Sequence, residues 1–276
     1  MIPLPIRPDP DDPSLTERVS GLDHEGRPVE LPVVVERALT LYLNGREIVT
    51  IMTIGDHLED LAVGYLLNQN MLRPDDRITA IDHDPETETL VVRTERVTDF
   101  EEKLKHRVLT SGCARGTVFG DIMDSFEQVR LSDTARLGTG RLLALSRRIN
   151  EIPSLYMAAG AIHGCVLARD DEPLIYMEDV GRHNAVDKIA GAMARRGIAP
   201  EDKLLYTTGR LTSEMVIKTV LMGIPILVSR SGFTARGVEL ARSAGLTLIG
   251  RARGRRFIAL TGTHRLVFED DGKSEH

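Results

Sequence analysis

The stretch KLLYTTGRLTSEMVIKTVLMGIPILVSRSGFTARGVELARSAGLTLIG, residues 203–250, decides the fold. Its apolar runs at 203–208, 225–229 and 246–250 have the length and composition of buried strands. The segments between them, 212–223 and 234–245, repeat apolar residues at helical spacing, and each ends at a glycine. Alternation of strands and helices is typical of a sheet that is at least partly parallel. The stretch therefore predicts an α/β domain.

The flanking residues extend this domain. Segments 161–169 and 173–179 read as a strand pair, and 255–262 as a last strand. A helix is expected over 184–197, with Asn184 as its N-cap. A further helix is expected over 133–150.

The first half of the chain predicts a smaller, mainly β unit. Asn44-Gly45 lies between two apolar runs, which is typical of a β-hairpin. The segment 55–72 has helical periodicity, with Asp56 as the expected N-cap. Two further strands are expected at 78–83 and 89–94.

These patterns predict two domains after a disordered arm. The arm, 1–25, begins with a stretch that holds five prolines. An N-terminal α+β domain spans 26–125 and ends in the loop around Cys113, and an α/β domain spans 126–276. The predicted fold class is therefore α/β with a smaller, mainly β α+β domain in front.

Composition excludes several classes of protein. No apolar run reaches the roughly 20 residues that a membrane helix needs, and the N-terminus does not resemble a secretory signal. Two cysteines form no disulfide framework and fit the cytoplasm. The net charge of −6 divides into −13 for residues 1–180 and +7 for residues 181–276. A basic C-terminal third suggests a localised anion site, although on charge counts alone a solvated, salt-bridged face is the favoured explanation. We expect neither nucleic acid nor a membrane as a partner.

Four predicted strands are followed by loops rich in Gly, Ser, Thr and Arg. In open α/β sheets, ligands bind where such strand ends meet helix N-termini, and arginine binds phosphate in bidentate geometry. Turn-forming residues alone would give single loops of this kind, but four in succession favour a phosphorylated ligand. Neither a G-x-G-x-x-G nor a P-loop motif is present. The arginines in these loops are Arg182, Arg210, Arg230, Arg251, Arg253, Arg255 and Arg256.

The block EDVGRHNAVDK, residues 178–188, concentrates polar side chains. We expect Asp179 to accept hydrogen bonds from a base or sugar and His183 to move a proton near neutral pH. Asp187 and Lys188 fit ordinary charges of a first helical turn. His163 fits a hydrogen-bonded strand histidine, and no Cys/His cluster has zinc spacing.

The stretch TSGCARGT, residues 110–117, holds one of the two cysteines. Small neighbours and the nearby Arg115 favour exposure and the thiolate of Cys113, which is the reactive form. An inert loop cysteine remains the alternative. Cys165 lies in an apolar strand and is interpreted as a small core residue.

Several blocks resemble the FdhD family of accessory sulfurtransferases for formate dehydrogenase. They are EDVGRHNAVDKIAGA, TTGRLTSEMVIK, GIPILVSRSGFTARGVELA, the Cys113 loop and LEDLAVGYLLNQNML. The resemblance spans about residues 30–265 and implies a three-layer, cytidine-deaminase-like C-terminal domain without zinc ligands. It also implies a cytoplasmic homodimer.

The resemblance implies a function and its residues. Such proteins accept sulfur from a cysteine desulfurase as a persulfide, here on Cys113. They transfer it to the molybdenum or tungsten bis(guanine dinucleotide) cofactor of the formate dehydrogenase catalytic subunit, for which GDP or GMP is a partial mimic. The matching cofactor-binding segment here is Arg251, Ala252, Arg253, Gly254, Arg255 and Arg256, and we add Arg182, His183, Arg210 and Arg230 from the other strand ends.

One departure affects the mechanism. Many members carry C-x-x-C in the loop, whereas Gly116 occupies the second position here. Either one cysteine suffices or another thiol, such as Cys165, assists. The alternative functions are a cofactor-binding chaperone without sulfur transfer and a nucleotide hydrolase or deaminase.

Overall fold

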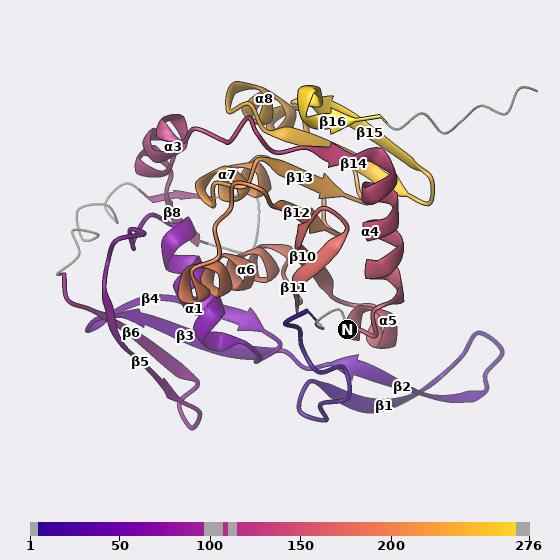
Figure 1. Cartoon of the computed structure of the whole chain (residues 1–276). Coiled ribbons are helices and arrows are strands. Elements are labelled where there is room, and N and C mark those ends of the chain that lie inside the picture. The colour runs from indigo at the N-terminus through magenta and orange to yellow at the C-terminus, as the bar shows by residue number, and fades with distance from the viewer. Residues whose placement is uncertain (1–4, 97–106, 110–114, 269–276) are drawn as a thin grey trace, which may run out of the picture.

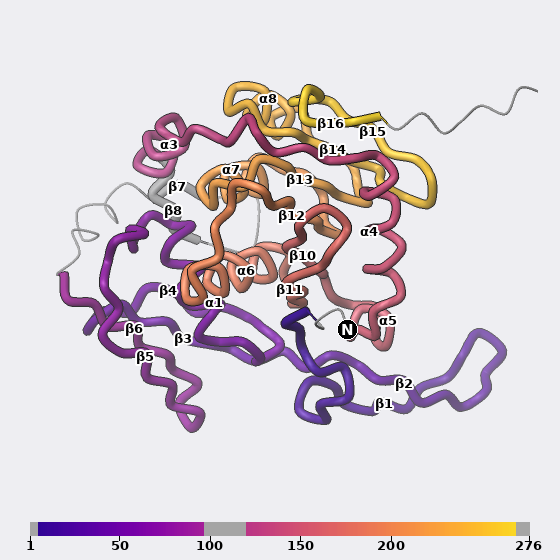
Figure 2. Tube along the Cα trace, in the orientation of Figure 1, coloured from indigo at the N-terminus to yellow at the C-terminus, as the bar shows by residue number. Residues whose placement is uncertain are grey.

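A six-stranded mixed sheet lies at the centre of the larger half of the molecule (Figure 1). The computed structural model describes residues 5–96, 107–109 and 115–268, whose path Figure 2 traces. The strands are β10 (His163–Arg169), β11 (Glu172–Asp179), β12 (Leu204–Thr207), β13 (Ile226–Ser229), β14 (Thr247–Arg253) and β15 (Arg256–Thr261). Their order is β11-β10-β12-β13-β14-β15. Strands β12, β13 and β14 run parallel and the other pairs antiparallel, which confirms the partly parallel α/β sheet.

Helices cover both faces of this sheet, so the domain has three layers. Along β12, Leu205 faces one apolar core, and Leu204 and Tyr206 face the other. Both faces of the strand are therefore buried, which explains its continuous apolar sequence. One face is covered by α3 (Phe119–Gln128), α6 (Arg182–Arg196), α7 (Ser213–Leu221) and α8 (Ala235–Ser243), and the other by α4 (Thr139–Glu151). The more specific cytidine-deaminase-like description stays a prediction.

The N-terminal unit is a four-stranded sheet with one helix. Its elements are β3 (Arg37–Leu43), β4 (Arg46–Thr53), β5 (Ile78–Asp84), β6 (Thr89–Thr94) and α1 (Leu58–Asn68), and the strand order is β4-β3-β6-β5. Asn44 has a φ of 56° in the tight turn between β3 and β4, so the predicted hairpin is confirmed. Leu39, Leu41 and Leu43 alternate into a core that α1 closes.

Helices α1 and α6 join the two units by crossing with almost no space between their backbones (Figure 1). A Cβ atom added to Gly64 would lie 1.7 Å from the carbonyl oxygen of Asp187. A Cβ on Gly191 would lie 1.9 Å from the carbonyl oxygen of Asp60. Glycine at both positions is therefore required by the close approach of the two helices.

The predicted disordered arm is wrong for residues 5–25. Strand β1 (Thr16–Leu22) pairs with β2 (Pro28–Val34) as an antiparallel ribbon. Leu15 is buried in a small core with Ile54, Leu155 and Ile162, and the N–H of Ile6 donates to the carbonyl of Leu174. The apolar side chains of Ile6 and Leu15 anchor the segment. The prediction of disorder considered only the proline and acid content and did not take these two side chains into account.

Element boundaries also differ from the predictions. Helix α3 crosses the predicted domain boundary at 125, and its Ile122 and Phe126 belong to the core of the larger unit. Helix α1 follows His57 rather than Asp56, and α6 begins at Arg182, so Asn184 lies within it. The remaining elements are β7 (Arg107–Leu109), β8 (Arg115–Val118), β9 (Leu137–Gly138), α5 (Leu155–Ala159), the 3-10 turn η2 (Thr263–Arg265) and β16 (Leu266–Val267).

Replacement of Gly64 by alanine should destabilise the protein by about 3 kcal/mol or more, because the new methyl group meets rigid backbone. Urea unfolding followed by circular dichroism measures the loss. Gly120, in α3, provides the control, because a Cβ atom added there would meet no other atom of the described residues within 4 Å. Gly120→Ala should stabilise the protein slightly, because alanine favours helix. Equal effects of the two substitutions would contradict close packing at Gly64.

Candidate functional site

A cavity of 410 Å³ lies at the edge of the central sheet where β12 and β13 end and β10 begins. The carboxyl ends of parallel strands meet at one edge, so loops far apart in the sequence gather there. The cavity is lined by Tyr156, Gly160, Ala161, Ile162, His163, Val180, Thr208, Arg230, Ser231 and Arg253.

Two arginines give the cavity its charge. Arg253 donates from Nε to the carbonyl oxygen of Arg230 at 3.0 Å, so the loop after β13 and the end of β14 are tied together. The guanidinium carbon of Arg230 lies 5.7 Å from the centre of the Tyr156 ring, within the range of a cation–π contact. Arg251 has a φ of 54°, and its N–H donates to the carbonyl of Ser231 at 2.7 Å. The chain is thereby bent so that Arg253 reaches the cavity.

His163 lies in the cavity wall. Its Nδ1 is 3.3 Å from Oγ1 of Thr208, and burial lowers its pKa, as do the charges of Arg182, His183 and Arg210. A neutral imidazole is therefore favoured beside these cations. The interpretation of His163 as a hydrogen-bonded strand histidine is correct for its contact with Thr208. It did not predict that His163 lines the cavity. His163 begins β10, which runs antiparallel to β12, so it lies beside the end of β12. This position could have indicated from the sequence that His163 belongs to the site.

The other predicted residues are not part of the cavity lining. His183 opens α6, and its Nε2 is 2.9 Å from Oε2 of Glu214 in α7. Burial lowers the pKa of His183, whereas the close contact with His183 lowers the pKa of Glu214. Arg182 packs its side chain against the backbone of Gly209. The remaining predicted residues are also outside the lining: Arg210, Arg251, Gly254, Arg255 and Arg256 are exposed, and Ala252 is buried.

The buried charges of residues 178–188 belong to a network between the two units, which the sequence did not reveal. The fully buried Lys188 donates from Nζ to Oδ2 of Asp179 at 2.7 Å and contacts Asp56 in the loop before α1. Thr53, at the end of β4, donates to Oδ2 of Asp179 at 2.6 Å. Asn184 donates to Oδ1 of Asp179 at 3.0 Å. Asp179 is thus occupied by protein donors, and its expected contact with a base or sugar is not supported.

Asp187 forms a second part of this network. Lys218 of α7 donates to its two carboxylate oxygens at 2.8 Å and 2.7 Å. Asn68 of α1 donates to Oδ1 at 2.7 Å. The interpretation of Asp187 and Lys188 as ordinary first-turn charges is wrong, because both side chains are buried and paired.

Cys113 lies outside the described residues. The other thiol, Cys165, is fully buried at the centre of the sheet, where its Sγ donates to Oγ1 of Thr207 at 3.3 Å. Burial raises the pKa of Cys165 to about 12, so its thiolate is scarce at neutral pH. The structure therefore confirms a core residue and does not support Cys165 as an assisting thiol.

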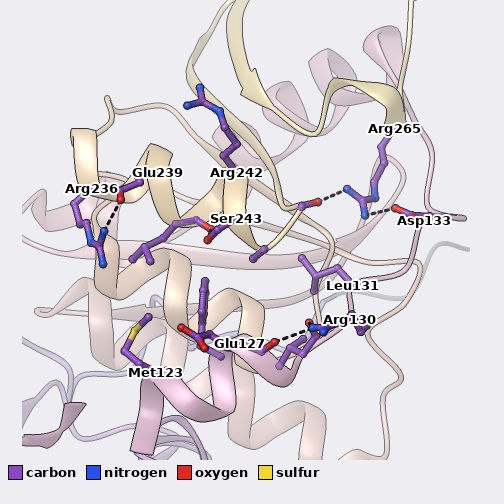
Figure 3. A pocket seen from close by; sticks show the side chains of 15 residues that line it. Met123, Glu127, Arg130, Leu131, Asp133, Arg236, Glu239, Arg242, Ser243 and Arg265 are labelled. Atoms are coloured by element: carbon purple, nitrogen blue, oxygen red, sulfur yellow. Dashed lines mark hydrogen bonds and ion pairs between the residues drawn. The ribbon is translucent and has the colours of Figure 1, made fainter. Parts of the chain in front are cut away.

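A second cavity, of 720 Å³, lies between α3 and α8 (Figure 3). Its charges are largely engaged within the protein. Arg236 pairs with Glu239 at 2.7 Å, and Arg265 pairs with Asp133 at 3.0 Å. Arg130 donates to the carbonyl of Glu127 at 2.7 Å. These contacts stabilise the wall of the cavity.

Two negative observations concern the described residues alone. No group of three or more His, Cys, Asp or Glu side chains is arranged to hold a metal ion there. None of the helices in that part of the chain is long and apolar enough to cross a membrane.

Comparison with known proteins identifies the family. The model of the FdhD/NarQ family matches residues 34–267, which include the four-stranded sheet, the six-stranded sheet and the cavity. The chain belongs to the FdhD/NarQ family. It is 32% identical over 242 residues to the sulfur carrier protein FdhD of Listeria innocua, covering 87% of this chain and 93% of that protein. It is 29% identical over 244 residues to the protein of the same name from Bacillus subtilis, covering 86% and 91%.

A solved structure has the same fold. It is the crystal structure of a protein from Desulfotalea psychrophila described as a formate dehydrogenase accessory protein. The match has a TM-score of 0.73 and 27% identity, and it covers 91% of this chain and 98% of that chain. The FdhD/NarQ fold is therefore shared over nearly the whole chain.

Loss of the buried cation should destabilise the fold. Lys188→Met leaves two carboxylates facing each other at the interface of the units, which should cost about 3–5 kcal/mol. Urea unfolding measures the difference. Arg18, in the exposed pair with Glu30, is the control, and Arg18→Met should leave the unfolding midpoint nearly unchanged. A small loss for Lys188→Met would show that the pair does not secure the interface.

The buried thiol should be unreactive in the native protein. In a Cys113→Ser variant, an aromatic disulfide reagent at pH 8 should find no fast-reacting thiol, because Cys165 is buried and protonated. In urea, one thiol per protein molecule, that of Cys165, should react with the reagent. Rapid native reaction would show that Cys165 is accessible to sulfur chemistry.

Proposed function

We propose that this protein is a sulfurtransferase. It accepts sulfur from a cysteine desulfurase as a persulfide on Cys113 and delivers it to the molybdenum or tungsten bis(guanine dinucleotide) cofactor of formate dehydrogenase. Support comes from a family whose relatives are named sulfur carrier proteins and from a related solved structure described as a formate dehydrogenase accessory protein. The observation that carries the cofactor part is the pair of guanidinium groups at a cavity on the strand ends.

The cavity suits a phosphorylated cargo. Arg230 and Arg253 are permanent cations with planar donors that match phosphate oxygens, and Ser231 and Thr208 provide further polar groups. The exposed Arg251, Arg255 and Arg256 add positive charge to the chain segment that carries Arg253. A cofactor with two dinucleotide tails carries several phosphates, so affinity should depend on this charge.

The first chemical step is a thiol exchange. The Cys113 thiolate attacks the outer sulfur of the desulfurase persulfide, an S–S bond forms at Cys113, and the desulfurase cysteine leaves as thiolate. Delivery of the outer sulfur as sulfide requires two electrons. We assign them to an external thiol pair that is oxidised to its disulfide, because Gly116 replaces a neighbouring cysteine and Cys165 is buried. A homodimer in the cytoplasm, docking to the desulfurase and to the formate dehydrogenase catalytic subunit, stays a prediction.

Incubation with a cysteine desulfurase and cysteine should add the mass of one sulfur to the protein. Mass spectrometry of the peptide that holds Cys113 should locate it, and a thiol reductant should remove it. Cys113→Ala should show no gain and should fail to support formate dehydrogenase activity, whereas Cys165→Ser should retain both. Full enzyme maturation by Cys113→Ala would favour the alternative, a cofactor-binding chaperone without sulfur transfer.

Arg253→Ala should weaken GDP binding about tenfold or more, because one charge-assisted contact to phosphate is lost. Calorimetric titration at two salt concentrations should also show a weaker salt dependence. Arg236, in α8 beside the other cavity, is the control, and Arg236→Ala should bind GDP as the wild type does. Equal affinities of all three proteins would exclude this cavity as the nucleotide site.

A further inference from the structure

A buried carboxylate lies behind the cavity without belonging to its lining. Glu178, at the end of β11, is 1% exposed. Its Oε2 accepts the N–H of Leu155 at 2.8 Å, and its Oε1 accepts the N–H of Tyr156 at 2.9 Å. The hydroxyl of Tyr176 also donates to Oε1 at 2.9 Å.

These bonds secure a helix that is too short to be stable alone. Helix α5 has five residues, and isolated helices of this length do not form in water. Glu178 binds its first two N–H groups, and the hydroxyl of Ser154 accepts the third, from Met157, at 3.3 Å. Gly160, with a φ of 76°, closes the other end. The position of α5 therefore depends on the carboxylate of the neighbouring strand.

Helix α5 carries one side of the cavity. Tyr156 is the aromatic residue in the lining, and its ring lies under the guanidinium of Arg230. An arginine side chain has many rotamers, and a fixed aromatic face reduces the number it occupies. The ring thus holds Arg230 in the cavity, in the same region as Arg253.

We propose that Glu178 is a positioning residue of the nucleotide pocket, because its carboxylate fixes α5 so that Tyr156 holds Arg230 against the phosphate of a bound nucleoside diphosphate. This proposal rests on the proposed function for the identity of the ligand. It assigns a task to the first residue of the EDVGRHNAVDK block, in which Asp179 and Lys188 contact Thr53 and Asp56 of the N-terminal unit.

The contact requires a carboxylate rather than a group of similar shape. A carboxylate only accepts hydrogen bonds, and here three donors converge on it. In Glu178→Gln, one of the two positions holds an amide NH₂ that faces a backbone N–H of α5. The substitution keeps the volume and removes the anchor, so α5 should shift while the sheet stays folded.

The chain contains no tryptophan, so Tyr156→Trp introduces a single fluorescent reporter at the site. In this background, GDP should change the emission with a saturable dependence. Adding Glu178→Gln should move the emission of the free protein to longer wavelength and weaken GDP binding about threefold to tenfold, the range of one cation–π contact. Tyr176→Phe should have a smaller effect, and Met157→Ala, on the exposed side of α5, should have none.

The outcomes separate positioning from stability alone. Unchanged emission and affinity in Glu178→Gln would overturn the proposal, as would a lower melting temperature with unchanged GDP affinity. If Glu178→Gln does not fold, Tyr156→Leu provides the test by calorimetry in the otherwise wild-type chain, and wild-type affinity there would overturn it. Failure of the wild type to bind GDP would instead contradict the proposed ligand, and the emission shift would still test the anchoring of α5.

Discussion

The buried ammonium of Lys188 is the interaction on which the arrangement of the two units depends. It is fully removed from water and is balanced by Asp179 at the end of β11 and Asp56 before α1. A buried cation is strongly unfavourable unless its partners stay in place. Lys188 therefore fixes the end of the central sheet, the first turns of α6 and the N-terminal unit relative to one another. The backbone contact at Gly64 and Gly191 allows this proximity.

The same constraint places the candidate site. Arg182 and His183 lie at the start of α6, one to two turns before Lys188, so the buried pair also determines where they lie beside the cavity. Glu178, next to Asp179, binds instead to the first two N–H groups of α5 and secures that helix. Adjacent residues at one strand end thus perform separate tasks. Asp179 joins the two units, and Glu178 organises the cavity wall.

Much of the fold could be predicted from local patterns. Period and length identified β12, β13 and β14 and the helices between them, because buried strands and amphipathic helices leave distinct signals. Asn44-Gly45 identified its hairpin for the same local reason. The order of residues 5–25 was missed, because the anchors Ile6 and Leu15 are single side chains whose partners lie far along the chain.

The sequence predicted which loops form the candidate site, but not how their side chains are arranged in space. The sequence by itself determined that several arginines follow strand ends, because the residue type and the strand periodicity are both local properties. Only the tertiary structure decided that Arg230 and Arg253 line the cavity while Arg251, Arg255 and Arg256 stay outside its lining. It also decided that Asp179 and Lys188 are structural and that His163 lies at the site. The reason is physical: burial and pairing depend on Thr53, Asp56 and other groups more than 100 residues away, which no local pattern encodes.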